Sequence, residues 1–163
     1  MSYPPDRYHG EHGDVSATFR RAEQEPDLRI GPISTTSYLA TGATTSGEFG
    51  LYRWDMSAIP AGPAAHFHRT ISESFFVLSG TVRIYDGEQW IDANTGDFAY
   101  VPAGGIHAFR NESGEPASML LLFAPGAPRE PYFEALADAV AAGRAMTAEE
   151  LTKLYLEHDT YML

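Results

Sequence analysis

The sequence predicts an all-β protein, an antiparallel sandwich or barrel with a polar segment before it and two short helices after it. Between residues 30 and 128, short runs of Val, Ile, Tyr, Phe and Thr are separated by Gly and Pro, at the spacing of roughly 8–12 residues that is typical of such folds. Asp86-Gly87 lies between two of these runs, and glycine there favours a hairpin turn. No helix-length periodic segment interrupts the runs, which argues against parallel βαβ units.

Nine segments have the composition of strands, since each combines β-branched and aromatic residues and is bounded by turn residues. In chain order they are residues 33–40, 49–56, 64–68, 74–80, 81–86, 89–93, 97–102, 106–111 and 117–124. We therefore expect one β-barrel domain over residues 30–128.

The two flanking segments differ in character from the barrel segment. Residues 1–29 are polar, rich in Pro, Gly, Glu and Arg, and have no sustained period. This pattern predicts an N-terminal arm that is flexible or exchanged with a neighbouring subunit. Residues 129–163 have helical patterns instead, and we expect them to form an extension that packs on the barrel.

The first helix of the extension is predicted over residues 130–142. Apolar residues recur there at the spacing of one helix face: Phe133, Leu136, Ala137 and Val140. Gly143 is a plausible stop. A second helix is predicted to begin at Thr147, because Thr147 and Glu150 match the capping box, in which each residue satisfies a backbone N–H of the other.

Composition excludes several classes of protein. The chain has 163 residues, about one domain, with 11 Lys and Arg against 22 Asp and Glu, a net charge of −11. This charge repels nucleic acid and anionic lipid, so we expect neither as a partner. The absence of cysteine excludes disulfides, thiolate zinc sites and a cysteine nucleophile. The first ten residues lack the apolar core of a signal peptide, which predicts a cytoplasmic protein.

The segment 64–73 raises the question of a metal site. His66 and His68 are two residues apart, so in a strand both imidazoles point to one face and Phe67 points to the other. Glu73 has the wrong parity for the same uninterrupted strand, so residues 69–72 must contain a turn or a bulge. This segment alone leaves two interpretations open, a metal site and a pair of buried structural histidines.

A second segment changes this interpretation. Its fixed positions match G-x5-P-x-G-x2-H-x3-N, the second signature motif of the cupin superfamily, at Gly96, Pro102, Gly104, His107 and Asn111. The segment with His66, His68, Glu73 and Gly80 resembles the first cupin motif, G-x5-H-x-H-x3,4-E-x6-G. It departs from that motif at Pro60, where the motif has glycine; Gly62 lies nearby.

The chain thus resembles small single-domain cupins, and its lead-in and tail are similar to those of quercetin-dioxygenase-type cupins. This resemblance implies a jelly-roll (cupin) β-barrel and a homodimer. It implies four metal ligands, His66, His68, Glu73 and His107, and a further role for Glu73 as the catalytic base. Gly104 would permit the turn before His107, and the side chain of Asn111 would bind backbone groups.

Such a ligand set indicates one divalent transition metal ion per chain. Three neutral imidazoles and one carboxylate leave a divalent ion with a charge of +1. Nitrogen and oxygen ligands suit Fe, Ni, Mn, Co and Zn without selecting among them. Four protein ligands also leave coordination positions open, as catalytic sites require.

An apolar aromatic pocket is expected beside this ion, although each of its residues also suits plain core filling. The candidates are Tyr52, Trp54, Phe75, Val77, Tyr100, Phe109, Met119 and Leu121. Such walls suit a flat hydrophobic substrate.

These features leave three functions open. The first is a metal-dependent dioxygenase acting with dioxygen on an aromatic or polyketide-like small molecule. The second is a non-oxidative metal-dependent cyclase or isomerase of a polyketide-type pathway. The third is a non-catalytic small-molecule-binding cupin. Oxygen consumption with substrate would discriminate between the first two functions.

Overall fold

The computed structural model describes residues 2–163, and it has the predicted all-β architecture. A six-stranded sheet has the order β1-β2-β3-β10-β5-β8, a three-stranded sheet the order β7-β6-β9, and β11 pairs with β4. The strands are β1 (Leu28–Ile30), β2 (Ser34–Ala40), β3 (Gly50–Met56), β4 (His66–Phe67), β5 (Ser72–Ser79), β6 (Thr81–Tyr85), β7 (Trp90–Asn94), β8 (Phe98–Val101), β9 (Ala108–Arg110), β10 (Ala117–Ala124) and β11 (Tyr161–Met162).

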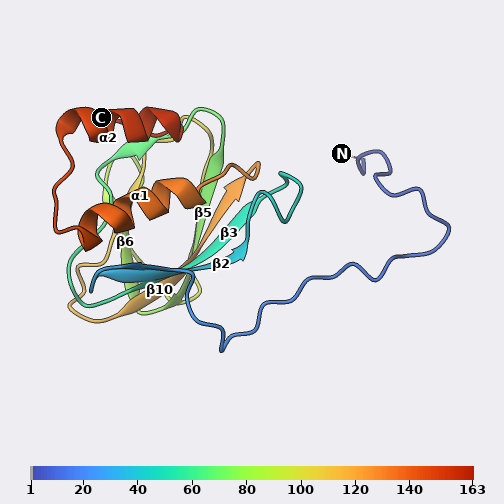
Figure 1. Ribbon diagram of the computed structural model, residues 1–163, viewed down its shortest axis with the longest axis horizontal. Helices are drawn as coiled ribbons and strands as arrows, with labels where there is room; N and C mark the ends of the chain where they lie inside the picture. The colour runs from blue at the N-terminus through green and yellow to red at the C-terminus, as the bar shows by residue number, and fades with distance from the viewer. Residues whose placement is uncertain (1) are drawn as a thin grey trace.

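All nine expected strands are present, and every named pairing is antiparallel. Two short strands, β1 and β11, lie outside the prediction. β1 begins inside the segment expected as an arm, where the Asp27 carboxylate accepts a hydrogen bond from Tyr38 N at 2.7 Å. Residues 2–19 are exposed, and Figure 1 shows this segment running away from the folded body.

The alternation of strand residues places the core between the sheets. In β5 the side chains of Glu73, Phe75 and Val77 are buried, whereas Phe76 between them is 39% exposed. The largest fully buried side chains include Tyr52, Phe123, Met119 and Leu121 from β3 and β10. These central strands therefore direct one face into the interior.

The two helices are α1 (Glu130–Ala141) and α2 (Ala148–Glu157). The capping box predicted at Thr147 and Glu150 is present, and Gly143 follows α1 with φ of +61°. None of the helices in residues 2–163 is long and apolar enough to span a membrane.

Helix α1 packs against the interior of the β-structure. The ring of Phe133 packs edge-on against two rings on the inner face of β3. Its centroid lies 5.4 Å from that of Tyr52 and 5.2 Å from that of Trp54. On the other side, the ring centroids of Tyr132 and Tyr155 of α2 lie 6.3 Å apart. Figure 1 shows α1 between the large sheet and α2. The helical extension therefore helps to form the interior of the molecule.

Candidate metal centre

Two backbone features bring the three histidines together. His66 and His107 form an antiparallel bridge with reciprocal N–H···O bonds of 2.9 Å, so their side chains share one face. His68 follows two residues after His66, and both are buried. The ring centroids of the three imidazoles lie 4.4 to 5.4 Å apart.

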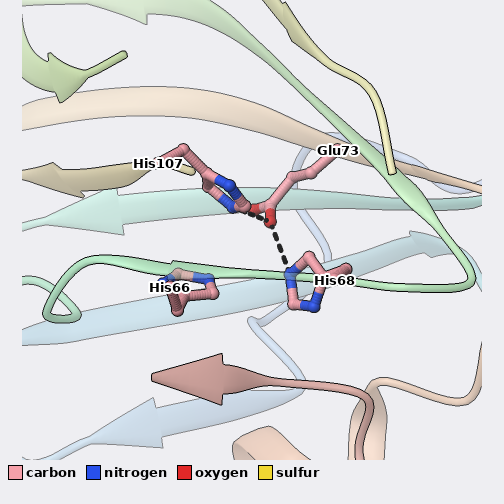
Figure 2. Close-up of side chains that lie close together, drawn as sticks. All are labelled: His66, His68, Glu73 and His107. Atoms are coloured by element: carbon pink, nitrogen blue, oxygen red, sulfur yellow. Dashed lines mark hydrogen bonds and ion pairs between the residues drawn. The ribbon is translucent and has the colours of Figure 1, made fainter. Parts of the chain in front are cut away.

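Glu73 reaches the same point from β5. The chain bends at Arg69 and Thr70 before β5 begins at Ser72, which is the predicted turn that resets the strand parity. Figure 2 shows His68 and His107 directed at the Glu73 carboxylate. Oε2 of Glu73 lies 3.1 Å from His68 Nε2 and 2.9 Å from His107 Nε2.

Each imidazole is oriented by a backbone carbonyl. Nδ1 of His66 lies 2.9 Å from Ala64 O, Nδ1 of His68 lies 2.6 Å from Asp159 O, and Nδ1 of His107 lies 2.9 Å from Gly105 O. A carbonyl only accepts hydrogen bonds, so each Nδ1 carries the proton. In the neutral ring the Nε2 lone pair is then free to bind a metal.

The donor set of this cluster fits a cation. The ligand atoms of His66, His68, Glu73 and His107 lie within 4.8 Å of one another, and bonds of about 2.0–2.2 Å place opposite ligands about 4 Å apart. Neutral Nε2 atoms and a carboxylate are all acceptors, so they need either protons or a positive ion between them. The buried cluster is therefore compatible with one metal ion after a small contraction.

The electrostatics differ between the histidines of the metal-free cluster, since burial would lower the pKa of His107 but its contact with Glu73 outweighs burial and raises it. Burial lowers the pKa of His66 to about 4, so this ring is neutral at pH 7. Burial alone would raise the pKa of Glu73, but its close contacts with His107 and His68 outweigh burial and hold this pKa well below its ordinary value. Glu73 therefore carries its negative charge at neutral pH.

The glycine and asparagine positions of the two motifs have the expected structural roles. Gly104 has φ of +85°, a region that favours glycine, and its N–H donates to His68 O at 2.6 Å. Nδ2 of Asn111 donates to Ser57 O at 2.8 Å and to Glu115 O at 2.7 Å. Outside the matched motif positions, a Cβ at Gly62 would lie 1.9 Å from Phe109 O, so glycine there allows the two backbone segments to approach closely.

A cavity of about 330 Å³ opens beside the cluster and includes His66 and Glu73 in its wall. Of the eight residues expected in a pocket, it is lined by Trp54, Phe109 and Leu121. Its wall also includes an arginine, three aromatic residues and two residues of the C-terminal tail: Arg129, Phe123, Tyr132, Phe133, Thr160 and Met162.

Four of the other pocket candidates fill the core and do not line this cavity: Tyr52, Phe75, Val77 and Met119, each 0% exposed. Phe75 packs behind His107, with ring centroids 5.9 Å apart. The hydroxyl of Tyr52 donates to Glu130 Oε1 at 2.6 Å.

The expectation that Tyr100 lines the pocket is corrected, because Tyr100 does not belong to the wall of this cavity. It is 61% exposed. In the β5–β8 pairing it stands opposite Ser74, whereas Val101 stands opposite Glu73. Paired residues share a face of the sheet, so the residue opposite the inward Glu73 faces the cluster and Tyr100 faces outward.

The helical extension supplies wall residues that sequence reasoning missed. Arg129, at the start of α1, is 3% exposed and lines the cavity. Thr160 and Met162 line it from the C-terminal tail, and Asp159 provides the carbonyl that orients His68. The sequence offered one signal for Arg129, which is an arginine immediately after the barrel segment and beside the aromatic face of a predicted amphipathic helix.

Comparison with known proteins agrees with this geometry. The family model for the cupin domain matches residues 56–123. A segment of 73 residues, 45% of the chain, is 36% identical to quercetin 2,3-dioxygenase from Bacillus subtilis, and it spans 21% of that protein's length.

Two solved structures show the same fold. An RmlC-like cupin from Shewanella frigidimarina aligns over 71% of this chain and 96% of its own, with 20% identity and a TM-score of 0.59. The polyketide cyclase RemF from Streptomyces resistomycificus aligns over 69% of this chain and 80% of its own, with 19% identity and a TM-score of 0.56. Residues 56–123 therefore match the cupin domain, the chain has the cupin fold, and it resembles the quercetin-dioxygenase type of cupin.

Proposed function

We propose that this chain is a metal-dependent enzyme, a dioxygenase that acts on an aromatic or polyketide-like small molecule. One divalent transition metal ion (Fe, Ni, Mn, Co or Zn) would be held by His66, His68, Glu73 and His107. The observation that carries the proposal is the convergence of three oriented Nε2 atoms and one carboxylate at the wall of an apolar cavity. The match to quercetin 2,3-dioxygenase supports the choice of chemistry.

Each group at the site would have a separate role in this reaction. The ion, when bound, would supply a Lewis-acidic centre with open positions for substrate and dioxygen. Trp54, Phe109 and Leu121 would bind the flat body of the substrate and exclude water. Glu73 is ionised and faces the cavity, so it would accept the proton of a substrate hydroxyl as that oxygen becomes anionic.

Oxygen uptake tests the reaction class. The protein is loaded in turn with each of the five metals and given polyhydroxylated aromatic compounds, while dissolved oxygen and products are followed. Oxygen consumption that requires both metal and compound supports a dioxygenase. A product formed without oxygen consumption indicates a cyclase or isomerase, whose chemistry the fold also accommodates. Binding without any product indicates a non-catalytic binding protein.

Glu73→Gln tests the role of Glu73 as base. Gln keeps the shape and one oxygen but cannot accept the proton, and removing a general base costs on the order of 10²–10⁴ in rate. Retained metal with lost turnover supports the role. Retained metal with unchanged turnover rules it out.

The proposed assembly is a homodimer. The outer face of β5 and β8 carries exposed aromatic side chains, Phe98 at 64%, Tyr100 at 61% and Phe76 at 39%, and exposed apolar patches mark association sites. Light scattering on Tyr100→Ser against wild type tests this: a dimer that persists unchanged places the interface elsewhere. A cytoplasmic location remains a prediction, tested by cell fractionation.

A further inference from the structure

Arg129 is a buried cation in the wall of the cavity. Its side chain is surrounded by aromatic rings that line the same cavity, with the guanidinium carbon 4.6 Å from the centroid of Tyr132, 5.1 Å from Phe123 and 5.7 Å from Phe133. The residue is 3% exposed. An arginine in such surroundings is desolvated, which is costly unless the charge and the N–H groups are compensated.

The compensation that the chain provides is incomplete. Nη1 donates to His158 O at 2.6 Å and lies 3.5 Å from Thr160 Oγ1. Nε is fully buried and has no hydrogen-bond partner. Among the ion pairs of residues 2–163, none joins a carboxylate to Arg129. An acceptor supplied from outside the chain would complete this site.

The surroundings select the kind of acceptor. Glu73 lines the same cavity and is the acidic group with the largest influence on Arg129. A divalent ion on the cluster would more than offset the charge of Glu73, so Arg129 and the loaded cluster together would make the cavity cationic. The remaining wall is mainly apolar and aromatic.

We propose that Arg129 binds an anionic oxygen of the substrate, so that the site selects aromatic substrates that carry a carboxylate, phenolate or enolate group. The inference rests on the proposed function for the identity of the cavity as the substrate site. It assigns a specificity role to a residue outside the barrel segment. The competing explanation is that Arg129 only anchors the C-terminal tail through His158 and Thr160.

A pair of probes of nearly equal shape separates the two explanations. Binding of 2-naphthoate and of its neutral analogue 2-naphthamide is measured by calorimetry, on metal-free protein and on protein loaded with Co²⁺. Wild type is expected to prefer naphthoate, more strongly with Co²⁺ because the ion offsets Glu73. Arg129→Met is expected to weaken naphthoate on the order of tenfold to a hundredfold, the effect of a charge-assisted hydrogen bond, and to leave naphthamide nearly unchanged.

Three further variants complete the test. Arg129→Lys keeps the charge and is expected to retain part of the preference, and it serves if Arg129→Met fails to fold. Arg110 carries an equal charge outside the cavity wall, with its guanidinium carbon 3.8 Å from the ring centroid of Trp90. Arg110→Met is therefore expected to keep the full preference. Asp159→Ala loosens the tail without removing the cation, and because Asp159 also orients His68 it is compared on metal-free protein alone, where it is expected to keep the preference.

Equal binding of the two probes by wild type, or an unchanged preference in both Arg129 variants, overturns the inference. A parallel loss of both probes in Arg129→Met and Asp159→Ala overturns it in favour of tail anchoring. Metal content and turnover are measured separately. A wild type that takes up no metal refutes the proposed function, while naphthoate preference in the metal-free protein still decides the role of Arg129.

Discussion

Asp159→Ala tests whether the C-terminal tail supports the metal centre. The Asp159 carboxylate accepts hydrogen bonds from Arg69 N at 3.1 Å, Thr70 N at 2.8 Å and Thr70 Oγ1 at 2.7 Å, which ties the tail to the turn between β4 and β5. The backbone oxygen of the same residue accepts the Nδ1 proton of His68 at 2.6 Å. One residue thus holds the turn and orients a ligand.

The expected loss of stability follows from these contacts. The three donors lie near the surface and can be rehydrated, so their hydrogen bonds sum to about 2 kcal/mol. Asp159 has φ of +50°, where alanine costs about 1 kcal/mol more. Asp159→Ala should therefore lower the free energy of unfolding by about 3 kcal/mol, or the Tm by roughly 6–12 °C for a chain of this size.

The matched control is Asp159→Asn. Asparagine tolerates positive φ and keeps one side-chain acceptor, so it should cost about 1 kcal/mol. Thermal unfolding of the metal-free proteins measures stability, and calorimetric titration with Co²⁺ measures metal affinity. Loosening the carbonyl partner of His68 should weaken Co²⁺ binding by about tenfold in the alanine variant.

Two results would refute this reasoning. An alanine variant within about 0.5 kcal/mol of wild type would mean that this carboxylate does not hold the tail. A full loss of stability with unchanged Co²⁺ affinity would mean that the tail does not orient His68.

Two other predictions concern packing and pH. Gly62→Ala should lower the free energy of unfolding by about 2 kcal/mol or more, because its Cβ would lie 1.9 Å from Phe109 O; urea denaturation with Gly13→Ala as the unhindered control checks this, and equal stabilities would contradict it. Burial raises the pKa of Tyr132 from 10.0 to about 12, so its contribution is fully present below pH 10 and is lost as the pH rises from 10 to 12. Wild type should lose about 1.4 kcal/mol per pH unit in that window relative to Tyr132→Phe, and parallel urea midpoints for the two proteins from pH 8 to 11 would contradict it.

Only part of the cluster was predictable from local sequence rules. The His-x-His spacing sets a shared face within one strand, and a short turn accounts for the parity of Glu73. The turn at Gly104 is also a local backbone requirement, met by φ of +85°. His107 lies in a separate segment and was assigned to the cluster only through the resemblance to the second cupin motif, and the structure brings it to the other three ligands by its bridge with His66.

The rest of the site depended on long-range pairing. Alternation along β8 distinguishes two faces but does not say which is inner; that is decided by the pairing of Tyr100 with Ser74. Arg129 and Asp159 enter the site only because α1 packs into the interior and the tail pairs with β4. No periodicity within the helical segment reveals such a partner.

Metal analysis of the purified protein tests the central claim most directly. Wild type, His107→Ala and His12→Ala are prepared identically, His12 being an exposed residue before β1, and their divalent transition metals are quantified after dialysis and after reloading with Co²⁺. The account predicts about one equivalent per chain in wild type and His12→Ala, and a loss of most of it in His107→Ala. Wild type without metal after reloading, or His107→Ala with a full equivalent, would contradict a metal centre at this cluster.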